Sequence, residues 1–170
     1  MLQLGANGLW YLLCLPDTLA FHRARRDVAG TQRELLMRLL RRNADTVLGR
    51  RYGFDRIRSV AEYQERVPLS TYDDYHEAIE RIGAGERAVL TRNPVLLLEL
   101  TSGSTAPTKH IPYTAALKAE FGHAIAPWIV DLYSHHPALV AGEAYWSITP
   151  VARRNQRTPG GIPVGFEEDS

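Results

Sequence analysis

The sequence contains one cysteine, Cys14, in 170 residues, which excludes an internal disulfide and a cysteine-based zinc site. We predict a buried structural thiol, since free cysteine is among the most buried residue types. Long apolar runs are also missing: Pro16 and Asp17 end the uncharged first 16 residues short of the ~20 residues that a membrane span needs. No basic leader precedes that run. These features predict a cytoplasmic protein without a membrane partner.

An excess of charge of one sign is missing as well. Twenty Lys plus Arg balance nineteen Asp plus Glu, so no global field drives the chain onto nucleic acid or an acidic membrane. Arginines concentrate in residues 23–58 on the polar side of a helical pattern, where we favour a solvated face over a nucleic-acid surface. Because the charges balance, we predict no nucleic-acid partner. The six histidines lack metal-ligand spacing, so we predict no metal site.

The chain is rich enough in apolar residues, at 45%, to form the core of about one domain. An apolar and then basic segment predicts a helix over 9–26, interrupted or kinked near Pro16. Helical spacing predicts another over 32–48, opened by a capping box of Thr31 and Glu34. Two further capping boxes predict short helices: Ser59 with Glu62, ending before Pro68, and Thr71 with Asp74, ending at 83–85.

Residues 94–170 have a different pattern. Continuous apolar residues predict strands over 95–98 and 144–148, and an extended piece is expected over 110–113. A cap at Thr114 and apolar residues on one face predict a helix over 115–133. The order strand, glycine loop, helix, strand predicts an α/β fold. We therefore expect a helical N-terminal segment, residues 1–93, packed on part of a β-sheet that begins in residues 94–170.

The segment TSGSTAPTK, residues 101–109, follows the first predicted strand directly. Its glycine allows close backbone approach, its hydroxyls and exposed amides donate hydrogen bonds, and its lysine supplies charge. These features predict a phosphate-binding loop, and the alternative is an ordinary polar turn. The loop is not of the G-x-x-x-x-G-K-[ST] kind, because Thr108 and His110 occupy two of its fixed positions. The predicted phosphate-binding residues are Thr101, Ser102, Gly103, Ser104, Thr105 and Lys109.

Lysine is rare in this chain, because only Lys109 and Lys118 among its twenty basic residues are lysines. A lysine inside a Gly/Ser/Thr loop of such a sequence indicates a specific need for a compact ammonium group. Lys109 is therefore the cation that we expect to hold phosphate.

The loop resembles the signature [ST]-S-G-[ST]-T-G-x-P-K of acyl-adenylate-forming enzymes, with Ala106 in place of a glycine and Thr108 in place of the proline. Over about residues 30–170 the chain resembles the bacterial form of the Gretchen Hagen-type acyl acid amido synthetases, the auxin-responsive promoter family. The resemblance rests also on NADTVLGRRYGF, VPLSTYDDYHEAIERIGAGERAVLT, HIPYT and GGIPVGFEEDS.

That resemblance implies a ligase that uses ATP and Mg²⁺. A carboxylic acid would form an acyl-adenylate, and an amine or amino acid would then displace AMP to give an amide. Residues 101–105 and Lys109 would surround the ATP phosphates. The helix after the loop would help to wall an acyl pocket, although we favour plain core for its residues at helical spacing. The candidate pocket residues are Phe121, Ile125, Trp128 and Ile129.

The sequence shows no segment that resembles an acidic magnesium motif or an aspartate motif for the ribose hydroxyls. We therefore expect the chain to be the front portion of a larger adenylate-forming domain, with its catalytic groups beyond residue 170, and to be inert by itself. The alternative is a small stand-alone module that binds a nucleotide or anion without catalysis.

Overall fold

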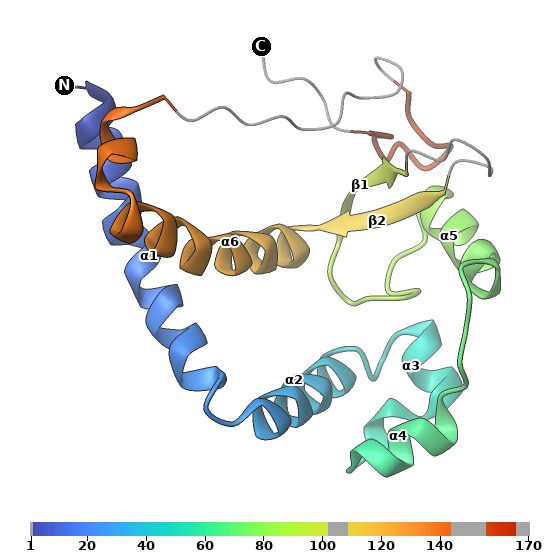
Figure 1. Ribbon diagram of the computed structural model, residues 1–170. Helices are drawn as coiled ribbons and strands as arrows, with labels where there is room; N and C mark the ends of the chain where they lie inside the picture. Colours follow the sequence, from blue (N-terminus) through green and yellow to red (C-terminus); the bar gives the residue numbers. More distant parts are fainter. Residues whose placement is uncertain (1, 102–108, 144–155, 166–170) are drawn as a thin grey trace. The chain divides into compact units, whose positions relative to one another are not determined.

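The computed structural model describes residues 2–101, 109–143 and 156–165 (Figure 1). The chain divides into two compact units, one of residues 1–31 and 117–148 and the other of residues 32–116 and 149–170. No helix among the described residues is long and apolar enough to cross a membrane. The division of the sequence at residue 93 into a helical and an α/β segment stays a prediction.

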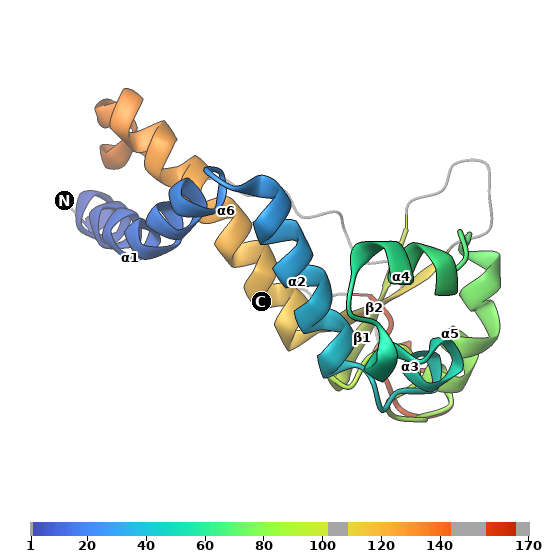
Figure 2. The ribbon, with the colours of Figure 1, turned by 90° about the horizontal axis from the view of Figure 1, so that it is seen from below.

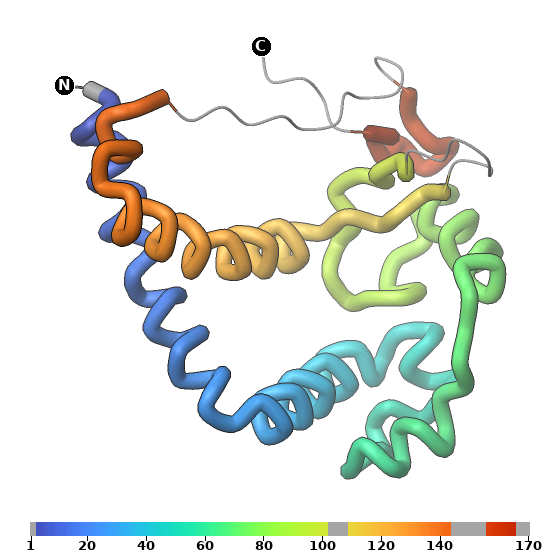
Figure 3. Tube along the Cα trace, viewed as in Figure 1, coloured from blue at the N-terminus to red at the C-terminus, as the bar shows by residue number. Residues whose placement is uncertain are grey.

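The first unit is built from two long helices that pack side by side (Figure 3). Helix α1 spans Leu2–Ala24 and continues through Pro16, so it begins earlier than predicted and is not interrupted. Helix α6 spans Ala115–His135 and confirms the helix predicted after Thr114. Their shared core consists of Cys14, Ala126, Ile129 and Tyr133.

Polar contacts hold the same unit together at its ends. The Asn7 side-chain amide donates hydrogen bonds to the carbonyls of Val140 and Gly142, at 3.0 and 2.9 Å, beside the 3₁₀ helix η3 (Pro137–Ala141). Further along α1, the Asp17 carboxylate lies 2.8 Å from the Nδ1 atom of His123 on α6. Both contacts join α1 to residues more than 100 positions away in the sequence.

The single helix predicted over 32–48 is wrong, because the structure has two: α2 (Val28–Arg42) and α3 (Val47–Tyr52). Helix α2 begins before Thr31, since the Asp27 carboxylate accepts the N–H of Gly30 at 2.9 Å and caps the helix earlier. Helix α3 has its own cap, the buried Thr46, whose hydroxyl accepts the N–H of Gly49 at 2.9 Å.

Tertiary contacts complete the start of α3. The N–H groups of Val47 and Leu48 donate to the carbonyls of Ala88 and Val89, at 2.9 and 3.0 Å. The first amides of a helix have no partner within it, so these two bonds satisfy groups that the helix itself leaves open. The break between α2 and α3 therefore depends on a segment some 40 positions away.

The two short helices predicted from capping boxes are present. Helix α4 (Val60–Arg66) begins at Ser59, whose hydroxyl accepts the N–H of Glu62 at 3.2 Å. Helix α5 (His76–Gly83) follows the 3₁₀ turn η2 (Asp73–Tyr75) and buries Ile79 and Ile82. A further 3₁₀ turn, η1 (Phe54–Arg56), links α3 to α4.

The sheet of the second unit has two antiparallel strands, β1 (Val95–Leu100) and β2 (His110–Thr114), which confirms the extended segments predicted there. On the other edge of β1, the N–H of Leu98 donates to the Pro163 carbonyl at 2.9 Å, and the Leu98 carbonyl accepts the N–H of Gly165 at 2.8 Å. The predicted strand over 144–148 lies outside the described residues.

Helices α3 and α5 lie next to this strand pair (Figure 2). Leu98 of β1 is 2% exposed and packs with Ile82 of α5 and with Val89, and Val47 of α3 borders the cluster. A second cluster joins Leu40 of α2 to Phe54 and Ile57. Helices that precede the sheet in sequence thus pack on it, as the predicted fold class requires.

Gly160 provides a test of this packing. Its N–H donates to the Gly83 carbonyl at 2.8 Å, and a Cβ atom at this position would lie 2.3 Å from the Gly85 nitrogen. We expect Gly160→Ala to lower the free energy of unfolding by about 1–3 kcal/mol, because the backbone must move apart. Gly122→Ala on α6 is the control, since its Cβ meets nothing within 4 Å. Urea denaturation measures both, and equal effects would contradict the close approach.

Cys14 reports on the core between α1 and α6. The side chain is 7% exposed, and burial, with a smaller contribution from Asp17, raises the pKa of its thiol. We expect slow reaction with Ellman's reagent in the native protein. Ile129→Ala should accelerate the reaction, because removing a buried isoleucine costs about 2–5 kcal/mol and loosens the site. Phe121→Ala, on the exposed side of α6, should leave the rate unchanged. A fast native reaction would refute the buried thiol.

Candidate functional site

The base of the predicted phosphate loop lies where β1 ends and β2 begins. The N–H of Thr101 donates to the Lys109 carbonyl at 3.1 Å, and the N–H of Lys109 donates to the Thr101 hydroxyl at 3.3 Å. The structure therefore brings together Thr101 and Lys109, two of the six predicted residues. The other four, Ser102, Gly103, Ser104 and Thr105, lie outside the described residues.

Tyr72 lies directly against this base. Its hydroxyl accepts the N–H of His110 at 2.9 Å and donates to the His110 carbonyl at 3.4 Å. The Nζ atom of Lys109 lies 5.1 Å from the centroid of the Tyr72 ring, within the range of a cation–π contact. Tyr72 is half-buried and Lys109 is exposed, so the ring supports the ammonium group from the protein side. Among the described residues, no carboxylate forms an ion pair with Lys109.

A tight turn holds Tyr72 in place. The Asp74 carboxylate accepts both the N–H and the hydroxyl of Thr71, at 2.7 and 3.0 Å. These bonds, the backbone bond first, hold the pKa of Asp74 below its usual value, and the positive charge of Arg51 adds to the effect. A capping box pairs its two residues reciprocally, and the structure shows the half in which the Asp74 carboxylate accepts from Thr71. The capping-box pattern predicts the pairing of residues 71 and 74, but no sequence pattern predicts that Tyr72 between them contacts the loop.

The four candidate pocket residues on α6 have different surroundings. Ile129 is 2% exposed and belongs to the core with α1, and Ile125 packs against the same core. Phe121 and Trp128 are 63% and 53% exposed. The preference for plain core holds for the two isoleucines, whereas the aromatic side chains face outward. Their assignment to an acyl pocket stays a prediction.

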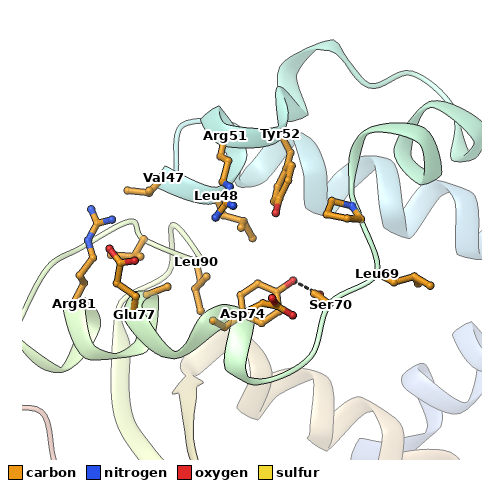
Figure 4. Close-up of a pocket in the computed structure, with 14 residues that line it drawn as sticks. Val47, Leu48, Arg51, Tyr52, Leu69, Ser70, Asp74, Glu77, Arg81 and Leu90 are labelled. Carbon is orange, nitrogen blue, oxygen red and sulfur yellow. Dashed lines mark hydrogen bonds between the residues drawn. The ribbon is translucent and has the colours of Figure 1, made fainter.

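A cavity of about 350 Å³ lies between α3, α5 and the segment 68–70 (Figure 4). Val47, Leu48 and Leu90 form part of its apolar wall, and charged side chains, among them Arg51 and Glu77, line it as well. The Tyr75 hydroxyl and the Ser70 hydroxyl are hydrogen-bonded at 2.7 Å beside it. No sequence pattern pointed to this cavity, because its lining comes from separate segments.

Arg81 also lines this cavity, and its charge is engaged elsewhere. It makes two hydrogen bonds with the Glu86 carboxylate, at 2.7 and 2.5 Å. These bonds lower the pKa of Glu86 from its ordinary value. The cavity contains neither Thr101 nor Lys109, so it is separate from the loop base.

Within residues 2–101, 109–143 and 156–165, no three His, Cys, Asp or Glu side chains come together in a way that could hold a metal ion. A divalent cation therefore has no preformed protein site among these residues. The predicted absence of a metal site stays a prediction for the chain as a whole.

Known proteins resemble both the sequence and the fold. Residues 19–167 match the family described as "GH3 family N-terminal domain". A "Probable indole-3-acetic acid-amido synthetase GH3.12" of Oryza sativa subsp. japonica is 37% identical over 86 residues, which is 50% of this chain and 14% of that protein. An "Indole-3-acetic acid-amido synthetase GH3.3" of Arabidopsis thaliana is 26% identical over 143 residues, 82% of this chain and 23% of that protein.

A solved structure agrees with these matches. "AtGH3.15 acyl acid amido synthetase in complex with 2,4-DB" superposes with a TM-score of 0.63 at 28% identity, covering 79% of this chain and 23% of that one. The chain thus spans about a quarter or less of the length of these similar proteins.

The turn that carries Tyr72 gives a pH-dependent prediction. Because the folded protein lowers the pKa of Asp74, its carboxylate stabilises the fold above the ordinary aspartate pKa, and this contribution is lost as pH falls through the lowered value. We expect Asp74→Asn to lower the urea midpoint at about pH 7 and to lower it much less at about pH 2. Asp73→Asn, which leaves the Thr71 contact intact, is the matched control. A difference independent of pH would contradict the assignment.

Proposed function

Because this chain belongs to the GH3 family, we propose that it supplies the ATP phosphate-binding part of an acyl acid amido synthetase. The observation that carries the proposal is the closed base of the β1–β2 loop, where Thr101 and Lys109 are hydrogen-bonded and the ammonium group lies 5.1 Å from the centroid of the Tyr72 ring. A hydroxyl and an ammonium group at the base of a Gly/Ser/Thr loop are suited to bind polyphosphate.

The proposed reaction has two steps. An oxygen of a carboxylic acid attacks the α-phosphorus of ATP, the bond between the α-phosphorus and the bridging oxygen breaks, and pyrophosphate leaves with the electron pair. The nitrogen of an amine or amino acid then attacks the acyl carbon, and AMP leaves as the amide forms and the amine loses a proton. In both steps Lys109 and the Thr101 hydroxyl would hold phosphate oxygens and offset their negative charge.

Mg²⁺ is part of the proposal only as the usual counter-ion of ATP. The described residues offer no cluster of acidic side chains that fits the ion, so no step is routed through it. The cytoplasmic location, the carboxylic acid and the amine are likewise proposed from the similar proteins and the sequence. The predicted pocket residues Phe121, Ile125, Trp128 and Ile129 remain candidates for the wall of the acyl site.

Binding of phosphate to this chain is the first test. We expect isothermal titration calorimetry to detect binding of ATP and of inorganic tripolyphosphate. Lys109→Ala should weaken the binding of both about 10- to 100-fold, since a hydrogen bond to a charged group contributes about 1.5–3 kcal/mol. Lys118→Ala removes the only other lysine and should have no effect. An equal loss of affinity in the two variants would show that Lys109 does not belong to the binding site.

The reaction itself is tested by exchange of labelled pyrophosphate into ATP. The reading frame that contains these residues is expressed in full, and exchange is measured with and without an added carboxylic acid. Exchange that needs the acid and falls in Lys109→Ala supports the ligase. If the protein binds tripolyphosphate but shows no pyrophosphate exchange with any added carboxylic acid, a binding module without catalysis is favoured instead.

A further inference from the structure

We infer that Tyr72 is the positioning residue for Lys109, presenting its ammonium group to phosphate. This inference rests on the proposed function and adds to it a residue outside the loop. Tyr72 lies 37 positions before Lys109 and reaches it from the turn that precedes α5. Its two functional parts, hydroxyl and ring, make separate contacts at the loop base.

The hydroxyl fixes the first residue of β2. The Lys109 carbonyl accepts a bond from Thr101 on the β1 side, whereas the next amide, that of His110, donates to Tyr72. The His110 carbonyl also accepts from the same hydroxyl, so both polar backbone groups of His110 are engaged by Tyr72 on the side away from β1. Two residues later Pro112 has no N–H, as is usual on an edge strand. Tyr72 therefore satisfies an edge that has no neighbouring strand among the described residues.

The ring contacts the side chain of Lys109. A lysine has four rotatable bonds and loses up to about 2 kcal/mol of side-chain entropy when it is held in one place. With Nζ 5.1 Å from the ring centroid, the ammonium group has an attractive contact before any ligand arrives. Part of the ordering cost of binding is thereby removed in advance, because the group is already placed.

The ring itself is held by groups that do not belong to the loop. Thr71 and Asp74, on either side of Tyr72, close the turn through two hydrogen bonds. Tyr72 is thus fixed by its own turn and is half-buried. This arrangement makes the ring a fixed support and the lysine the group that depends on it.

The first experiment needs no ligand. The chain has two lysines, so protein labelled with ¹³C-lysine gives two sets of Cε–Hε signals, from Lys109 and Lys118. We expect the Hε protons of Lys109 to be shifted upfield by the Tyr72 ring current, and Lys109→Arg assigns the signal. Tyr72→Phe keeps the ring and should retain most of this shift, whereas Tyr72→Leu should abolish it. An unshifted Lys109 signal, or a shift that survives in Tyr72→Leu, would overturn the inference.

The second experiment measures the dissociation constant of inorganic tripolyphosphate. We expect Tyr72→Phe to weaken binding about 2- to 10-fold, since one neutral hydrogen bond contributes about 0.5–1.5 kcal/mol. Tyr72→Leu should weaken it further. In the Lys109→Ala background neither change should have any additional effect, because a positioning residue acts through the group it positions. Tyr75→Phe removes a neighbouring hydroxyl that contacts only Ser70 in the described part of the chain and is the matched control.

The outcomes separate this inference from the proposed function. If wild-type protein shows the ring-current shift and binds no tripolyphosphate, the phosphate assignment fails while the Tyr72–Lys109 contact stands. If wild-type protein binds tripolyphosphate and the Tyr72 variants bind equally well or more tightly, Tyr72 does not position Lys109. If the Tyr72 substitutions weaken tripolyphosphate binding equally in the wild-type and Lys109→Ala backgrounds, Tyr72 has a general structural role, and this result would also overturn the inference.

Discussion

The second unit depends on the hydrogen bonds made by the two edges of β1. Strand β2 pairs with one edge, and Leu98 bonds to Pro163 and Gly165 on the other. A strand in the middle of a structure must satisfy its amides and carbonyls on both sides, because buried backbone groups without partners are costly. With its backbone satisfied, Leu98 can place its side chain in the core beside Ile82 and Val89. The segment 156–165 thus completes the hydrogen bonding of Leu98 on the edge that β2 does not cover.

That central strand determines where the loop base lies. The end of β1 supplies Thr101, the start of β2 supplies Lys109 and His110, and Tyr72 reaches them from the turn before α5. The two strand ends and the turn before α5 therefore meet at the residue that carries the ammonium group. Their positions follow from strand pairing and from the packing of α5.

Helix α6 shows how similar residues in one sequence pattern acquire different environments. Trp128 and Ile129 are adjacent and apolar, yet only Ile129 is buried, because α1 covers that side of the helix with Cys14. Helical spacing identifies an apolar stripe without identifying the surface that covers it. Burial in the structure assigns the two isoleucines to the core. A bound ligand would test whether the two aromatic residues line a pocket.

The sequence by itself determined the features that arise from local interactions. Ser59 and Glu62 are three residues apart, so their cap was predictable, and the loop string together with the segments on either side of it indicated the family. Tertiary structure decided the rest. Asp27 replaced Thr31 as the cap of α2, and the carbonyls of residues 88 and 89 completed the start of α3. The contact between Tyr72 and Lys109 joins segments that no periodic pattern links, because the pairing of the strands and the packing of α5 on them bring the two residues together.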